Sequence, residues 1–162
     1  MIVVGIDPGV TGAVAVIDDD SADVFDIPAF KVSSMTMIDA IELRAMLRDL
    51  DPDIVFVEQV HANAISYKSN FALGHAIGTI TTVVTLQEIS MQRIQPKEWQ
   101  RLTGLTSIPA KERKKAHRGR AAEMWPNLRF KLNRVADHNR ADALLIAAGG
   151  LKSIKERNSV PS

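Results

Sequence analysis

No cysteine occurs among the 162 residues, and this absence excludes several classes of protein at once. Disulfide-stapled scaffolds, zinc ribbons and thiol catalysis all depend on that side chain. The sequence also lacks a basic start followed by an apolar stretch long enough for a signal peptide or a membrane span. We therefore expect a cytoplasmic protein.

The composition is typical of one compact domain. Apolar residues make up 46% of the chain, which at this length is enough to build a core without a disulfide or a structural metal. A formal net charge of +1 says little about partners, because nucleic-acid binding depends on how the charge is distributed. We expect one domain over residues 1–151, followed by a polar C-terminal tail, 152–162.

The order of the apolar segments predicts an α/β fold. Three β-branched runs, at 2–6, 13–17 and 24–27, predict an antiparallel meander. Further strands are expected at 53–57 and 90–95, and helices at 38–50, 69–88, from 96, at 110–125 and at 139–148. The last helix is expected to stop at the two glycines 149–150. This order predicts a mixed sheet flanked by helices, with the ends of the first and fourth strands close together.

Two carboxylates lie at those strand ends. Asp7 ends the first strand and is followed by a loop, 8–12, whose glycines let the backbone turn sharply and approach a phosphate. Glu58 ends the fourth strand. A single acid in such a place is often only a solvated loop residue. Two acids that both directly follow buried runs favour a functional site.

A third carboxylate, Asp142, lies in the almost purely apolar last helix. A buried carboxylate without a partner is costly, so it needs a cation, a proton or a hydrogen-bond donor. An internal salt bridge with Arg140 or Lys97 is the alternative to a functional role.

Three more candidates precede Asp142 at the start of the same helix. His138 and Asn139 share its face, while Asp137 is placed where helix caps are common. A helix cap is the alternative for Asp137, and a surface or capping histidine is the alternative for His138. Oxygen ligands suit hard cations, and the absence of cysteine and of a paired-histidine motif disfavours zinc. We expect Mg²⁺, with Mn²⁺ as a substitute, and two such ions can hydrolyse a phosphodiester without a protein nucleophile.

Taken together, the segments 5–9 with 11–12, 57–60 and 137–148 resemble the RuvC-type Holliday junction resolvases. The likeness is closest to the short, phage-borne members and extends from residue 1 to about residue 151, and for a phage protein the cytoplasm would be that of the host. It implies an RNase H-like fold, a homodimer, and metal-dependent cleavage of four-way DNA junctions.

The resemblance also implies roles for individual residues. It implies that Asp7, Glu58 and Asp142 bind the metal. The family's fourth acid corresponds to Asn139, a neutral residue here. Asp137, two residues before Asn139, is the only carboxylate available to replace it. The predicted catalytic and metal-binding set is therefore Asp7, Glu58, Asp137 and Asp142, with His138 and Asn139 as less certain ligands.

A basic run at 111–120 holds six of the twenty basic residues of the chain and predicts contact with phosphates. A solvated helix face is the alternative. The family's aromatic residue after the glutamate is replaced by His61 here. The predicted DNA-binding residues are Lys97, Lys111, Arg113, Lys114, Lys115, Arg118, His61 and Tyr67. Trp99 and Trp125 are expected in the core.

Three functions compete at this point. The first is structure-selective, Mg²⁺-dependent cleavage of branched DNA by a homodimer, with the apolar segment 71–86 either pairing with its copy or filling the monomer core. The second is a catalytically weak junction-binding protein, suggested by Asn139 and His61. The third is the phosphate-binding domain of an actin-like ATPase or sugar kinase, suggested by the Asp7 loop.

Overall fold

A computed structural model describes residues 1–60 and 67–159 of the chain. Its centre is a five-stranded sheet in the order β3-β2-β1-β6-β7. The strands are β1 (Val3–Asp7), β2 (Ala13–Ile17), β3 (Ala22–Asp26), β6 (Ile54–Glu58) and β7 (Ser90–Ile94). The first three form the predicted antiparallel meander, while β6 runs parallel to β1 and β7 parallel to β6. The predicted mixed α/β fold is confirmed.

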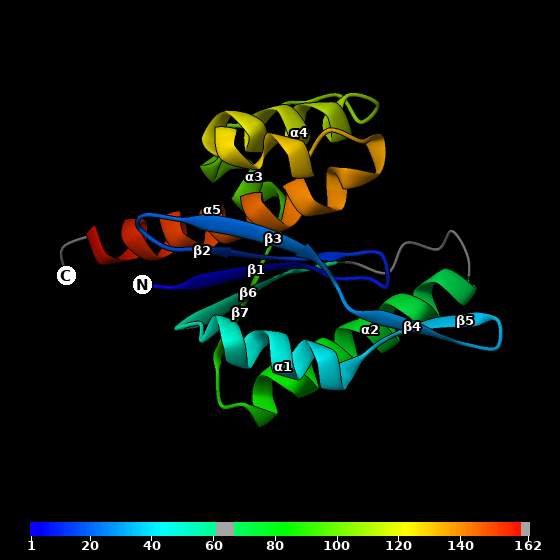
Figure 1. Cartoon of the computed structure of the whole chain (residues 1–162). Helices are drawn as coiled ribbons and strands as arrows, with labels where there is room; N and C mark the ends of the chain where they lie inside the picture. Colours follow the sequence, from blue (N-terminus) through cyan, green and yellow to red (C-terminus); the bar gives the residue numbers. More distant parts are fainter. Residues whose placement is uncertain (61–66, 160–162) are drawn as a thin grey trace.

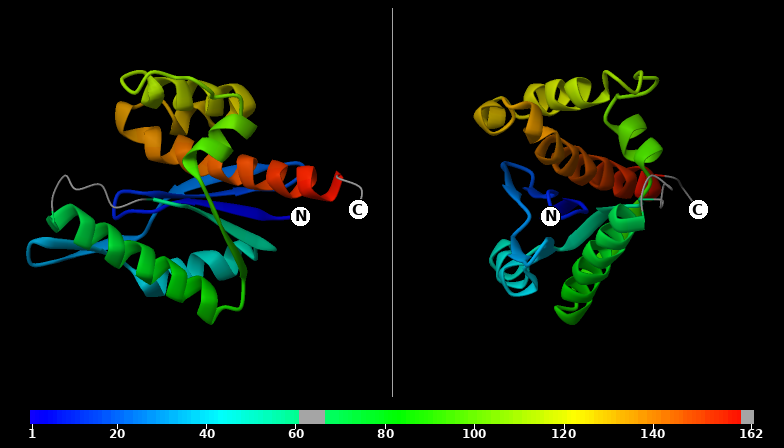
Figure 2. Two further views of the ribbon diagram at one scale, coloured as in Figure 1. Left: turned by 180° about the vertical axis from the view of Figure 1, so that it is seen from behind. Right: turned by 90° about the vertical axis from the view of Figure 1, so that its right-hand side faces the viewer.

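Helices cover both faces of this sheet (Figures 1 and 2). On one face, α1 (Ala40–Leu50) and α2 (Tyr67–Leu86) close an apolar core with β1, β2 and β6. On the other face, α5 (His138–Ser159) packs directly on β1 and β2. The short α3 (Pro96–Leu102) and the basic α4 (Arg113–Met124) pack against α5 in turn. Because both faces are covered, β1 and β6 read as continuous apolar runs.

Short elements complete the chain. The 3₁₀ turns η1 (Pro126–Lys131) and η2 (Val135–Asp137) connect α4 to α5. A hairpin of β4 (Ala29–Val32) and β5 (Met35–Ile38) forms a separate two-stranded sheet that the sequence analysis did not predict. Every residue of β4 is exposed, so no buried face imposes the alternating pattern that reveals a strand. No helix in the described ranges is long and apolar enough to cross a bilayer.

The last helix differs from the prediction, because α5 continues through Gly149 and Gly150 to Ser159. A Cβ at Gly150 would lie 2.3 Å from the ring of Phe56, and one at Gly149 would lie 2.6 Å from the Cβ of Trp99. The glycines therefore allow close packing and do not end the helix. The helix thus takes in residues 152–159 of the expected polar tail, and Ser153 is buried within this part.

Candidate active site

The two strand-end acids lie side by side on parallel neighbours. Ile6 of β1 pairs with Val57 of β6, which places Asp7 and Glu58 next to each other at the carboxyl edge of the sheet. Asp142 approaches from α5, the helix that packs across β1 and β2. The structure thus brings together three predicted site residues from three separate elements.

Electrostatics confirm that these acids influence one another. Burial raises the pKa of Asp7 well above its ordinary value, and the neighbouring charges of Asp142 and Glu58 raise it further. Burial also raises the pKa of Glu58, although a hydrogen bond from Trp99 opposes that shift. Like charges that share a site favour protonation or the arrival of a cation.

Two side chains that the sequence analysis did not place in the site contact these acids. Trp99, on α3, donates its indole N–H to Oε1 of Glu58 at 2.9 Å. His117, on α4, places Nδ1 2.6 Å from Oδ1 of Asp142. The partner of Asp142 is therefore neither of the basic residues considered from the sequence. Sequence reasoning missed His117 because its burial, shared with Ala121 on an otherwise polar α4, is set by the tertiary structure.

The side chains around the three acids offer mainly oxygen atoms to a metal ion. Among residues 1–60 and 67–159, no three acidic or histidine side chains lie close enough together to form a ready-made metal cage. Three neighbouring carboxylates repel one another without a counter-charge, and Glu58 and Asp142 are each turned towards a donor. Their oxygens are nevertheless the ligands that a hard cation such as Mg²⁺ prefers. The residues present fit such an ion chemically.

Comparison with known proteins gives a match in structure but not in sequence. No protein-family model and no curated protein match the chain. Thermus thermophilus RuvC in complex with a Holliday junction substrate has a TM-score of 0.65 at 15% identity, covering 96% of both chains. A second structure of Thermus thermophilus RuvC has a TM-score of 0.60 at 20% identity, with 97% of both chains covered. The yeast mitochondrial Holliday junction resolvase has a TM-score of 0.62 at 13% identity, covering 97% of this chain and 80% of that one.

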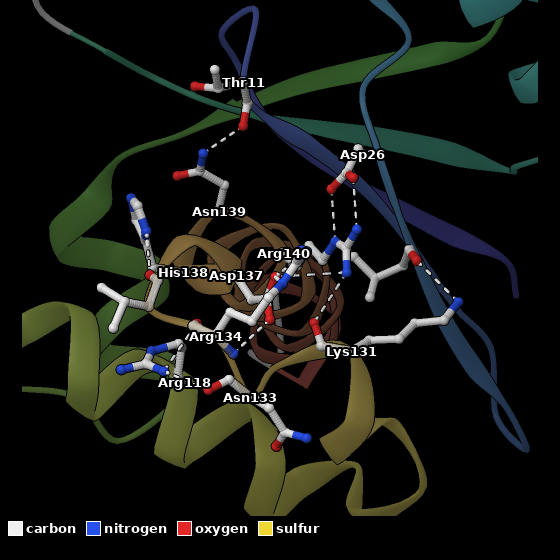
Figure 3. A network of polar contacts seen from close by, with 12 residues as sticks. Thr11, Asp26, Arg118, Lys131, Asn133, Arg134, Asp137, His138, Asn139 and Arg140 are labelled. Carbon is white, nitrogen blue, oxygen red and sulfur yellow. Dashed lines mark hydrogen bonds and ion pairs between the residues drawn. The ribbon is translucent and has the colours of Figure 1, made fainter.

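The chain has the fold of the RuvC-type Holliday junction resolvases. In this RuvC-like fold, Asp137 lies beside Arg134 and Arg140, as Figure 3 shows. Its buried carboxylate accepts hydrogen bonds from the backbone N–H of Arg134 at 2.7 Å and from that guanidinium at 2.8 and 3.0 Å. Arg140 lies 3.7 Å from the same carboxylate and binds Asp26 on β3. The structure thus places Asp137 against two arginines that neutralise its charge, and its predicted role as a metal ligand stays a prediction.

The pKa of Asp137 reflects this environment. Burial disfavours its ionised form, but the hydrogen bonds from Arg134 and the charges of Arg134 and Arg140 outweigh burial and lower the pKa. Asp137 therefore serves as a charged anchor for the start of α5, which is close to the capping role considered as its alternative.

The other two candidates for the fourth ligand lie along the wall of a cleft of about 480 Å³. Asn139 donates its side-chain amide to the carbonyl of Thr11 in the loop after β1 (Figure 3). The amide oxygen of Asn139 has no hydrogen-bond partner among the described residues. Nδ1 of His138 lies 3.0 Å from the carbonyl of Val135. The hydrogen bond from Asn139 ties the start of α5 to the loop that follows Asp7.

The predicted DNA-binding residues fall into different environments. Lys97 is exposed on α3, and Lys111, Arg113, Lys114 and Lys115 are exposed at or just before the first turns of α4. Arg118 instead donates to the carbonyls of Asn133 and Arg134, so it holds the chain before α5. Tyr67 is 89% exposed at the start of α2, and His61 lies outside the described residues.

Proposed function

We propose that this chain is a structure-selective endonuclease that cleaves four-way or other branched DNA by metal-dependent phosphodiester hydrolysis. The observation that carries the proposal is the placement of Asp7, Glu58 and Asp142 at one edge of the sheet, where each adds to an unfavourable negative charge. No cation of the described residues forms an ion pair with Asp7. Such a site gains most from a bound divalent cation.

The neighbours' known substrates support the choice of DNA junctions. One of the two RuvC structures is bound to a Holliday junction, and the yeast protein is a mitochondrial Holliday junction resolvase. The likeness in fold spans nearly the whole chain. We propose four-way junctions as the first substrate to examine.

The acids would hold Mg²⁺, or Mn²⁺ in its place, as a pair of ions. Bound metal supplies an activated water and stabilises the leaving oxygen of the phosphodiester. Asp7 and Glu58 present oxygens from the rigid sheet, and Asp142 presents its own from α5. We propose Asn139 as the neutral fourth ligand, because Asp137 is bound by arginines while Asn139 precedes Asp142 by one helical turn and is hydrogen-bonded to the loop that follows Asp7.

The basic start of α4 would bind the DNA backbone. Lys111, Arg113, Lys114 and Lys115 are exposed on the helix that also brings His117 to Asp142. Phosphates bound there would therefore lie beside the acidic site. Such contacts position the DNA without reading its sequence.

The outer face of α2 would pair with a second copy of the chain. The helix buries Ala76, Ile80, Val83 and Val84 in the monomer core, which accounts for one face only. Its opposite face exposes Phe71 by 54% and Leu86 by 76%, and a Cβ at Gly74 or Gly78 would meet nothing within 4 Å. An open apolar face with small residues allows close helix packing. Light scattering of wild type and Phe71→Glu should show a dimer that the variant loses.

Cleavage of a labelled mobile four-way junction, beside a linear duplex of the same sequence, tests the main proposal. Wild type in Mg²⁺ should nick the junction symmetrically and leave the duplex intact. EDTA or Asp7→Asn should abolish the cut and leave junction binding in place. ATP turnover without DNA would instead support the phosphate-loop alternative.

A second candidate is a junction-binding protein that cuts weakly or not at all. The neutral Asn139, in place of a fourth acid, is the observation that favours it. Tight junction binding without cutting in either Mg²⁺ or Mn²⁺ would establish this candidate. Restoration of cutting in Asn139→Asp would then identify the missing carboxylate as the cause.

A further inference from the structure

Two donors from neighbouring helices hold two of the three carboxylates. Trp99 binds Glu58, and His117 binds Asp142. The two donor rings also touch edge to face, with centroids 5.1 Å apart and planes at 73°. We propose that Trp99 and His117 form a positioning pair that fixes the directions of Glu58 and Asp142 for the reaction. This inference rests on the proposed nuclease function.

The need for such a pair follows from the charges. Asp7, Glu58 and Asp142 repel one another, and side chains free to rotate would turn apart before a cation arrived. Hydrogen bonds to ionised oxygens are short and about twice as strong as those between neutral groups. Donors placed behind Glu58 and Asp142 therefore resist this separation and keep the acids in place for the metal.

The donor rings are themselves held firmly. Trp99 is 1% exposed and His117 is 6% exposed, so neither ring can turn without displacing core residues. A Cβ at Gly149 would lie 2.8 Å from Cα of Trp99, which shows how closely α3 lies against α5. Thr103 donates its hydroxyl to the carbonyl of Trp99 at 2.8 Å. The pair is thus anchored to the helix that carries Asp142.

The environment of His117 favours positioning over proton transfer. We assign the hydrogen of its bond to Nδ1, because an ionised Asp142 can only accept. The other ring nitrogen, Nε2, is buried and has no hydrogen-bond partner in the described part of the chain. A relay between protein groups would need a second polar side chain at that nitrogen. His117 instead orients Asp142 through one bond, with its ring supported by Trp99.

Three variants separate the donor from the ring. Trp99→Phe and His117→Phe each remove the donated hydrogen and retain an aromatic ring, whereas His117→Asn retains a donor near the position of Nδ1. We expect each phenylalanine variant to lower kcat for junction cleavage, and the affinity for Mg²⁺ by calorimetry, about 10- to 100-fold. KM and junction binding in EDTA should stay unchanged. His117→Asn should recover part of the loss, and Trp125→Phe is the matched control.

Nuclear magnetic resonance gives a readout that does not need cleavage. The chain has two tryptophans, so Trp125→Phe identifies the indole N–H signal of Trp99 even if Trp99→Phe fails to fold. In wild type this signal should exchange slowly with solvent and shift when Mg²⁺ is added. His117→Phe should shift it as well, because the two rings are in contact.

The outcomes are distinct. Folded Trp99→Phe and His117→Phe proteins that keep wild-type kcat and Mg²⁺ affinity would overturn the positioning pair. An indole N–H signal of Trp99 that exchanges fast with solvent and does not shift on addition of Mg²⁺ would also overturn it. A wild type that never cuts junctions would defeat the proposed function, while the indole signal and the Mg²⁺ affinity would still report on the pair.

Discussion

Gly150 of α5 lies directly against the ring of Phe56 on β6, so closely that a Cβ there would come within 2.3 Å of the ring. Gly150→Ala should therefore force apart the helix that carries Asp142 and the strand that carries Glu58. Overpacking of this kind costs about 1–3 kcal/mol, measurable by urea denaturation. Gly119→Ala is the matched control, because a Cβ there meets nothing within 4 Å. It should gain up to about 1 kcal/mol of helix stability. An equal change in the free energy of unfolding for Gly150→Ala and Gly119→Ala would contradict the packing argument.

Asp7→Asn should abolish cleavage and yet stabilise the metal-free protein. The pKa of Asp7 is raised above 3.8 in the folded state, so above pH 3.8 the folded protein holds a proton that the unfolded chain releases. Stability therefore falls as the pH rises through that interval. Asparagine removes this loss, and we expect the Tm in EDTA to rise by about 2–4 °C at neutral pH. The gain should shrink as the pH falls towards 3.8, where wild type is protonated too. A Tm difference that does not change with pH would contradict the charge argument.

Asp137→Asn should lower stability and spare cleavage, whereas Asp142→Asn should abolish cleavage and spare the fold. Asp137 is bound by Arg134 and lies near Arg140, so its loss weakens the start of α5 by about 1–3 kcal/mol without removing a site oxygen. Junction cleavage at a temperature where the variant is folded should therefore survive. Asp142→Asn should keep the fold and lose cleavage. Loss of junction cleavage in a folded Asp137→Asn protein would show that Asp137 takes part in catalysis.

Asp137 should affect the pH dependence of stability in the opposite direction to Asp7: its contribution to stability is lost as the pH falls. The pKa of Asp137 is lowered, because bonds from Arg134 outweigh the effect of burial. Its contribution is thus present above the ordinary value of 3.8 and is lost as the pH falls through the lowered value. The difference in Tm between wild type and Asp137→Asn should shrink on acidification. A difference that grows at low pH would be inconsistent with the arginine bonds.

The double change Lys114→Gln with Lys115→Gln should weaken junction binding whatever the DNA sequence. If each lysine neutralises one phosphate, the slope of log affinity against log salt should fall by about two in the double variant. Fluorescence anisotropy in EDTA at several salt concentrations measures this slope. Lys155→Gln, near the far end of α5, is the matched control and should leave it unchanged. An unaltered slope in the double variant would mean that this part of α4 is only a solvated face.

The sequence determined the sheet and two of its acids. Apolar runs of strand length fixed β1 and β6, and parallel neighbours end at the same edge of a sheet, so Asp7 and Glu58 had to lie close together. Asp142 was also predictable, because a carboxylate in a buried helix needs a partner. In each of these cases the evidence is local in the sequence, because an acidic residue directly follows or interrupts an apolar run.

Only the tertiary structure decided which neighbours join those acids. Asp137 forms ion pairs with Arg134 and Arg140, so its carboxylate is already neutralised. Trp99 is 41 residues from Glu58 in sequence, and His117 is 25 residues from Asp142. Contacts over such separations leave no periodic trace in the chain, because they depend on how closely α3 and α4 pack on α5.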